Sequence, residues 1–126
     1  MKDISERDLA GNLKLVAKRS ADHRTIVRVG NVEIGGGGFT VIAGPCTVES
    51  RDQVIDIAGA VRTRGASMLR GGAFKPLTFP YRSEKVFELG LEGLRYLKEA
   101  GKISGLPVVT EVTDVRKVGE MAELAD

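Results

Sequence analysis

The pattern of hydrophobic and polar positions divides the first part of the chain into a polar start and a short hairpin. Residues 1–24 are polar without a clear period, and we expect an N-terminal extension there. Residues 25–34 hold two short β-rich runs around Gly30-Asn31, a pair typical of a two-residue hairpin turn. The four glycines at 35–38 could be a phosphate loop, but no Gly-Lys-Ser/Thr sequence follows them. Residues 25–38 are therefore predicted as a β-hairpin and a glycine-rich connector.

From residue 39 the pattern alternates between strands and helices. The continuous apolar run 39–43 is typical of a strand that is buried on both faces. Residues 67–70 and 108–112 are predicted as the second and third strands. The spacing of these strands suits βα units of a parallel sheet.

Capping and terminating residues set the expected bounds of the helices. Ser50 and Gln53 have the spacing of a capping box, and Gly65 is expected to end the first helix. Gly101 is expected to end the second helix, and Thr113 or Asp114 to cap the third. The expected apolar faces of the three helices are Val54, Ile57, Ala58 and Val61, then Leu91, Leu94 and Leu97, then Val115, Val118, Ala122 and Ala125.

The predicted fold class is α/β, but the spacing alone leaves two architectures open. A flavodoxin-like open sheet and a (β/α)8 TIM barrel both begin with such units. A closed barrel needs ~250 residues, and this sequence has 126. If the barrel applies, residues 39–126 are the first three βα units of a truncated barrel, preceded by the hairpin.

Composition narrows the class of protein. Hydrophobic residues make up 42% and charged residues 29%, an ordinary balance for a soluble globular domain. The sequence has no apolar run long enough to cross a membrane and no signal peptide at its start, so a cytoplasmic location is expected. The net charge is only +2, the charges are interspersed and there is no Trp, which argues against a nucleic-acid partner.

Chemically reactive side chains follow the ends of the three predicted strands. Cys46 follows the first strand, Arg70 and Lys75 follow the second, and Glu111 ends the third. The carboxyl ends of parallel strands share one edge of a sheet, so these groups should meet there. Two cations beside Gly71-Gly72 suit a phosphorylated or carboxylated ligand.

The thiol and the carboxylate leave several roles open. A single cysteine is most often a small buried hydrophobic residue. At a strand end near cations, however, Cys46 can be a thiolate that binds a metal or acts as a nucleophile. Glu111 can hold a water, pair with a cation or accept a proton. The residues thus predict an anionic small-molecule site, and they do not specify a reaction.

Several motifs at and around these residues occur together and in order. They lie at 43–50 (Ala-Gly-Pro-Cys-Thr-Val-Glu-Ser), 69–78 (Leu-Arg-Gly-Gly-Ala-Phe-Lys-Pro-Leu-Thr), 80–81, 90–100 and 108–112. From about residue 25 onward the sequence resembles 3-deoxy-D-arabino-heptulosonate 7-phosphate (DAHP) synthase of the microbial class with a short N-terminus. In that family the hairpin covers the bottom of the barrel.

The resemblance implies an activity and a cofactor. The family condenses phosphoenolpyruvate with erythrose 4-phosphate to DAHP and phosphate, which opens the shikimate route to aromatic amino acids. A divalent metal activates the aldehyde, and Cys46 would be one of its ligands. Manganese is common in the family, but a thiolate also suits iron, cobalt or zinc.

The resemblance also assigns roles in substrate binding. Arg70 and Lys75 would bind phosphoenolpyruvate, with Lys75 also acting as a catalytic proton donor near the aldehyde. Pro76 and Thr78 would line the erythrose phosphate site, and Glu111 would lie beside phosphoenolpyruvate and a water. We expect a homo-oligomer that binds these small molecules.

Two departures from the family pattern limit these expectations. Leu77 stands where the family has the Arg of Lys-Pro-Arg-Thr, which bears on the identity of the aldose. The octulosonate 8-phosphate synthases share Gly-Pro-Cys but lack Lys-Pro-x-Thr. The family's further metal ligands (His, Glu and Asp) lie beyond residue 126, and one cysteine cannot hold a catalytic metal. The 126 residues alone are therefore expected to be inactive, and a non-catalytic half-barrel module and a phosphoenolpyruvate-binding paralogue stay open as alternatives.

Overall fold

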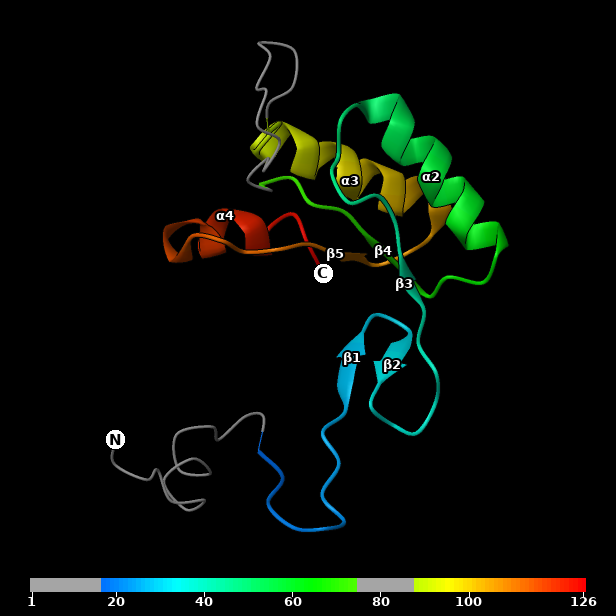
Figure 1. Cartoon of the computed structure of the whole chain (residues 1–126), viewed down its shortest axis with the longest axis vertical. Coiled ribbons are helices and arrows are strands. Elements are labelled where there is room, and N and C mark those ends of the chain that lie inside the picture. Colours follow the sequence, from blue (N-terminus) through cyan, green and yellow to red (C-terminus); the bar gives the residue numbers. More distant parts are fainter. Residues whose placement is uncertain (1–16, 75–87) are drawn as a thin grey trace.

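A computed structural model describes residues 17–74 and 88–126, which form a mixed α/β unit (Figure 1). The antiparallel pair is β1 (Val27–Val29) and β2 (Val32–Ile34), and the parallel sheet has the order β3 (Ile42–Ala43), β4 (Met68–Arg70) and β5 (Val108–Val109). The helices are α2 (Arg51–Thr63), α3 (Leu91–Ser104), the 3₁₀ helix η1 (Val115–Lys117) and α4 (Val118–Ala122). No helix in these two ranges is long and apolar enough to span a bilayer.

The predicted hairpin is confirmed, and it lies against the start of a sheet strand. Val29 pairs with Val32 across the turn, and Gly30 has a φ of 56°, a conformation that glycine adopts without steric cost. A Cβ at Gly30 would lie 3.9 Å from Cγ of Pro107, which immediately precedes β5. The hairpin turn therefore lies at the N-terminal edge of the sheet, opposite the edge to which the reactive side chains were assigned.

Helix α2 begins and ends where its sequence predicts. The Ser50 hydroxyl accepts a hydrogen bond from the backbone N–H of Gln53 at 3.2 Å, and Gly65 follows the helix with a φ of 88°. The Gln53 side chain accepts from the backbone N–H of Glu49 at 3.0 Å, one residue earlier than in a standard capping box. The cap fixes the direction in which the chain leaves the segment after β3.

Helix α3 continues past the residue that was expected to end it. Gly101 lies inside the helix and is buried, and Gly105, with a φ of 69°, forms the C-cap instead. A Cβ at Gly101 would approach Cγ2 of Val108 to 2.4 Å and the carbonyl oxygen of Leu106 to 2.8 Å. The glycine allows close packing of α3 on β5, so the prediction that it terminates the helix was wrong.

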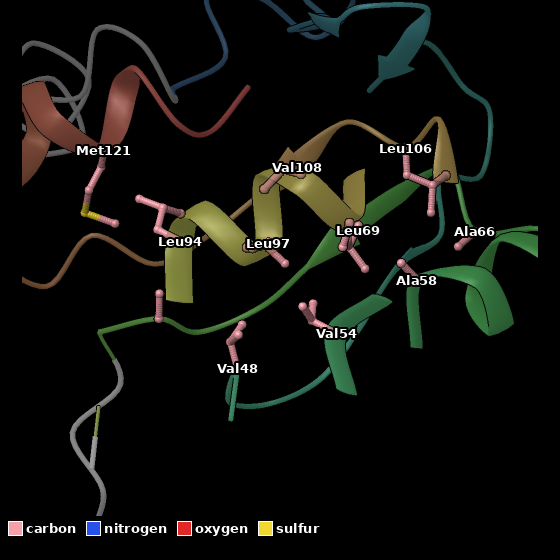
Figure 2. Close-up of a cluster of buried hydrophobic side chains, with 12 residues drawn as sticks. Val48, Val54, Ala58, Ala66, Leu69, Leu94, Leu97, Leu106, Val108 and Met121 are labelled. Carbon is pink, nitrogen blue, oxygen red and sulfur yellow. The ribbon is translucent and has the colours of Figure 1, made fainter. Parts of the chain in front are cut away.

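The hydrophobic core lies between the sheet and the pair of helices α2 and α3. Both helices lie on the same side of the sheet (Figure 1). Val54 from α2, Leu69 from β4 and Leu94 and Leu97 from α3 are fully buried, with Val108 of β5 at 1% exposure (Figure 2). Each such side chain contributes ~1.5–3 kcal/mol when it is removed from water.

The segment at and before β3 is incompletely covered, and the face of the sheet opposite α2 and α3 is open at Ile42. Phe39 is 93% exposed, and Val41 and Ile42 are 38% and 43% exposed. The strand covers only Ile42–Ala43, so the expectation that 39–43 forms a strand buried on both faces was wrong for this chain. A parallel strand is buried on both faces only when helices or further strands cover both faces of the sheet. Here α2 and α3 cover one face.

The last helical segment is divided into a 3₁₀ turn and a short α-helix. Asp114, not Thr113, is the cap of η1, because its carboxylate accepts from the backbone N–H of Arg116 at 2.9 Å. Val115 and Val118 are 86% and 49% exposed, whereas Met121 is 2% exposed. The 3₁₀ turn has three residues per turn, which displaces the apolar stripe expected for a continuous α-helix. Ala122 is exposed as well, so the predicted apolar face was wrong at Val115, Val118 and Ala122.

An ion pair on the surface joins the two core helices. The Arg51 guanidinium of α2 donates Nε–H to Oε2 of Glu99 on α3 at 2.9 Å, with a second contact between Nη2 and Oε1. The hydrogen bond and the charge of Arg51 lower the pKa of Glu99, and the same contacts raise the pKa of Arg51. Both groups are exposed, so the ion pair links α2 and α3 at the surface, outside the hydrophobic core.

Candidate functional site at the C-terminal ends of the strands

Arg70, the last residue of β4, joins the ends of all three parallel strands. Its Nη1 donates to the carbonyl oxygen of Pro45, which follows β3, at 3.0 Å. Its Nη2 donates to Oε1 of Glu111, which follows β5, at 3.0 Å. The side chains of Arg70 and Glu111 are 33% and 38% exposed, so the pair lies at the surface of a rim and is only partly shielded from water.

Gly44 allows the chain after β3 to approach this arginine. Its φ is 155°, and a Cβ there would lie 1.9 Å from the carbonyl oxygen of Arg70 and 3.1 Å from its backbone nitrogen. A side chain at this position would separate β3 from β4. The glycine thus brings the next residue, Pro45, to hydrogen-bonding distance of the guanidinium.

The backbone after Arg70 is held from both sides. Gly72 forms an isolated parallel bridge with Thr47, and its carbonyl oxygen accepts from the N–H of Val48 at 2.9 Å. On the other side, the Thr110 hydroxyl donates to the carbonyl oxygen of Gly71 at 2.7 Å. The Gly-Gly pair is therefore a short extension of the sheet, anchored to the segments after β3 and β5.

Packing explains why a glycine stands at position 71. A Cβ there would lie 2.8 Å from Cδ1 of Leu97 and 3.0 Å from Cγ2 of Val48, both in the core. In the sequence the two glycines were noted only as neighbours of the two cations at the expected ligand site. The structure adds a second reason, since the backbone rests directly on buried side chains.

Cys46 lies on the same rim. It follows Pro45 directly, and it is exposed. The alternative in which the only cysteine is a buried core residue is therefore wrong. Within 17–74 and 88–126, no group of three or more His, Cys, Asp or Glu side chains is arranged to hold a metal ion. Cys46 is thus a single candidate ligand in the part of the chain that is described.

Three residues of the predicted site, Lys75, Pro76 and Thr78, lie outside the described residues. Leu77, which departs from the family pattern, lies outside them too. The described residues before position 75 and after position 87 are close together, because the N–H of Gly90 donates to the carbonyl oxygen of Ala73 at 3.0 Å. The structure therefore brings Cys46, Arg70 and Glu111 to one edge of the sheet, and the assignment of Lys75 to this edge stays a prediction from the sequence.

Two participants in this arrangement were not identified from the sequence. The carbonyl oxygen of Pro45 binds Arg70, but a backbone acceptor has no signature in a sequence. Thr110 lies at the end of the third predicted strand, and its partner Gly71 lies 39 residues earlier in the chain. The first contact depends on how β3 lies beside β4, and the second on the register of β4 on β5.

Comparison with known proteins places the chain in a family. Residues 14–126 match the DAHP synthetase I family. The chain is similar to the phospho-2-dehydro-3-deoxyheptonate aldolase of Thermotoga maritima, with 42% identity over 113 residues, 90% of this chain and 32% of that protein. It is also similar to the 2-dehydro-3-deoxyphosphooctonate aldolase of Nitrobacter hamburgensis, with 32% identity over 116 residues, 86% of this chain and 39% of that protein.

Solved structures give the same relationship. A crystal structure of the DAHP synthase of Thermotoga maritima aligns with a TM-score of 0.70 at 42% identity, over 81% of this chain and 28% of that one. A truncated form of the Thermotoga maritima synthase aligns with a TM-score of 0.66 at 39% identity, over 81% of this chain and 34% of that one. The chain thus spans about a third of the length of these relatives.

Proposed function

Because the chain belongs to the DAHP synthetase I family, we propose that the whole protein is a DAHP synthase. It would condense phosphoenolpyruvate with erythrose 4-phosphate to DAHP and phosphate, the first step of the shikimate route. The observation that carries the proposal is the position of Arg70, whose guanidinium is fixed by Pro45 and Glu111 at the shared edge of three parallel strands. This edge is where parallel α/β folds bind their ligands.

Arg70 is suited to bind the anionic groups of phosphoenolpyruvate. The two bonds to Pro45 and Glu111 hold its planar guanidinium in one orientation. A guanidinium has further N–H donors, and it binds phosphate or carboxylate through pairs of them. Since its orientation is set before the ligand arrives, less side-chain entropy is lost on binding.

The adjacent segment would complete the substrate site. Lys75 follows Arg70 closely in the sequence and would supply a second cation to phosphoenolpyruvate and a proton near the aldehyde. Pro76 and Thr78 would line the erythrose phosphate site. Glu111 would hold a water beside phosphoenolpyruvate while it orients Arg70.

A divalent metal is part of the proposal, and the chain's contribution to it would be the Cys46 thiolate. The exposure of Cys46 on the rim fits one ligand of such an ion. The described residues do not fit a complete site, because they contain no three-ligand group and catalytic metals commonly have three protein ligands or more. When bound, manganese or a softer ion such as iron, cobalt or zinc would polarise the aldehyde.

We also propose that the described unit is the beginning of a (β/α)8 barrel. The support is the parallel order β3-β4-β5 with helices on one face, while the other face is open at Ile42. Residues 39–126 would provide the first three βα units, the hairpin at 25–38 would cover the bottom, and 1–24 would be an extension. A cytoplasmic homo-oligomer stays a prediction.

A second candidate function differs in the aldose. The similarity to an octulosonate aldolase favours it, as does Leu77 at the Arg position of Lys-Pro-Arg-Thr. An eight-carbon product requires a five-carbon aldose phosphate, because phosphoenolpyruvate supplies three carbons. The two functions thus share the Arg70 site and differ at the second substrate.

The test is the product of the full-length protein. Phosphate release from phosphoenolpyruvate is measured with a divalent metal and either erythrose 4-phosphate or arabinose 5-phosphate. The mass of the sugar product is determined by mass spectrometry. The proposal predicts release only with an aldose, and a seven-carbon product. An eight-carbon product would support the second candidate, and no aldose-dependent release would contradict both.

A further inference from the structure

Thr110 occupies the position at which the backbone pairing of β4 and β5 ends. Up to that point the strands are joined by backbone bonds, from Leu69 N–H to the Pro107 carbonyl at 2.9 Å and from Gly71 N–H to the Val109 carbonyl at 3.3 Å. The next contact comes from a side chain, since the Thr110 hydroxyl donates to the carbonyl oxygen of Gly71 at 2.7 Å. At 2.7 Å this is the shorter of the two contacts that hold Gly71 to the β5 segment.

The residue held by Thr110 is the one that follows the arginine of the proposed phosphoenolpyruvate site. Gly71 has no side chain, so hydrogen bonds and packing alone fix its peptide planes. Its neighbour Gly72 is bonded to Val48 on the other side. Without the Thr110 bond, the 3.3 Å bond from the Gly71 N–H to the Val109 carbonyl would be the remaining backbone contact between Gly71 and the β5 segment.

Thr110 and its neighbour Glu111 hold Arg70 in two different ways. Glu111 binds the guanidinium directly at 3.0 Å, whereas Thr110 binds the backbone immediately after the residue. Both contacts come from one dipeptide at the end of β5. A shift of that backbone would move the Cα of Arg70 relative to Pro45 and Glu111, and would change where its remaining N–H donors point.

We propose that Thr110 is a positioning residue that sets the orientation of Arg70 toward phosphoenolpyruvate by holding the carbonyl of Gly71. It does not touch the substrate. This inference rests on the proposed function, since it takes Arg70 as the ligand of phosphoenolpyruvate. It assigns to Thr110 a role in the affinity for one substrate and none in the chemistry at the aldehyde.

The experiment replaces the hydroxyl and keeps the shape. Thr110→Val in the full-length protein removes the O–H and should raise KM for phosphoenolpyruvate about fivefold, the effect of one hydrogen bond, with kcat and the aldose KM within about twofold of wild type. Thr110→Ser restores the hydroxyl and should restore KM. Thr113→Val makes the same change at an exposed threonine and should have no effect.

The readouts separate positioning from a purely structural role. A lower melting temperature with an unchanged KM for phosphoenolpyruvate in Thr110→Val would overturn the inference, as would a Thr110→Ser variant that resembles Thr110→Val. If Thr110→Val does not fold, Thr110→Ala takes its place with the same expectation, and failure of both to fold would also overturn it. Absence of aldose-dependent phosphate release in the wild-type protein would instead contradict the proposed function.

Discussion

Nη2 of Arg70 and Oε1 of Glu111 lie 3.0 Å apart and join the ends of two adjacent parallel strands. The carboxylate orients the guanidinium, and it also cancels part of its positive charge. The two effects act in opposite directions on the affinity for an anion, and they can be separated by substitution.

Glu111→Gln keeps an oxygen acceptor of the same size and removes the charge. We expect KM for phosphoenolpyruvate to stay within about twofold of wild type or to fall. Glu111→Ala removes the acceptor too, and KM should rise about two- to fivefold, as for a partly exposed ion pair. Steady-state kinetics of the full-length protein provide the measurement. The control is Glu120→Ala on α4, which breaks the ion pair with Lys117 of η1. Equal KM values in both Glu111 variants would show that orientation does not matter.

Gly44→Ala should disrupt the rim. The added methyl group would lie 1.9 Å from the carbonyl oxygen of Arg70, and a φ of 155° is rarely adopted by other residues. We expect a loss of about 2 kcal/mol or more in the free energy of unfolding. The matched control is Gly59→Ala in the middle of α2, where a Cβ has no neighbour within 4 Å and should stabilise by about 0.5–1 kcal/mol. Equal melting temperatures for the two variants would contradict the close approach of β3 and β4.

Gly101→Ala tests the packing of α3 on β5. Helix propensity alone predicts a gain of about 1 kcal/mol, because the residue lies inside a helix. The structure predicts a loss of about 1–3 kcal/mol, since the methyl group would overlap Cγ2 of Val108 and the carbonyl of Leu106. Chemical denaturation distinguishes the two by the sign of the change, and a stabilised variant would refute the observed packing.

The contact between Arg51 and Glu99 gives a pH dependence of stability. Arg51 lowers the pKa of Glu99 in the folded state below its unfolded value, so the pair stabilises the fold above about pH 4.3 and is lost as the pH falls through the lowered pKa. The melting temperature of wild type should therefore exceed that of Glu99→Gln near neutral pH, and the two should converge in acid. Salt should reduce the difference, because both groups are exposed. A difference that does not shrink as the pH falls through the lowered pKa of Glu99 would contradict the assignment.

The isolated 126-residue chain should not form DAHP. Its described residues provide one candidate metal ligand, Cys46, and the Arg70 side of a substrate site. Phosphate release from phosphoenolpyruvate and erythrose 4-phosphate by the isolated chain, compared with the full-length protein at equal concentration, is the measurement. Turnover by the isolated chain would show that the remaining ligands and cations are not required.

The sequence predicts local features well where one residue type has one dominant use. Ser50 caps α2 and Gly30 forms the hairpin turn as expected, because both act through their own backbone neighbours. The meeting of Arg70 with Glu111 at one edge follows from the rule that the carboxyl ends of parallel strands share an edge of the sheet.

Features that depend on distant neighbours were mispredicted or missed. Gly101 and Gly105 both look like helix terminators, and only the approach of Val108 decides that Gly101 lies within α3. Met121 replaces Val115 as the buried residue because a 3₁₀ turn precedes α4. The Thr110 contact with Gly71 depends on the strand register, which periodicity does not specify.

The most direct test of the Arg70 site is isothermal titration calorimetry, in which phosphoenolpyruvate is titrated into the full-length protein with no aldose present. Wild type should bind, and Arg70→Ala should bind about tenfold or more weakly, since hydrogen bonds to charged groups are worth ~1.5–3 kcal/mol. Arg95→Ala, at an exposed position on α3, should bind as wild type does. Equal affinity of wild type and Arg70→Ala would contradict the account.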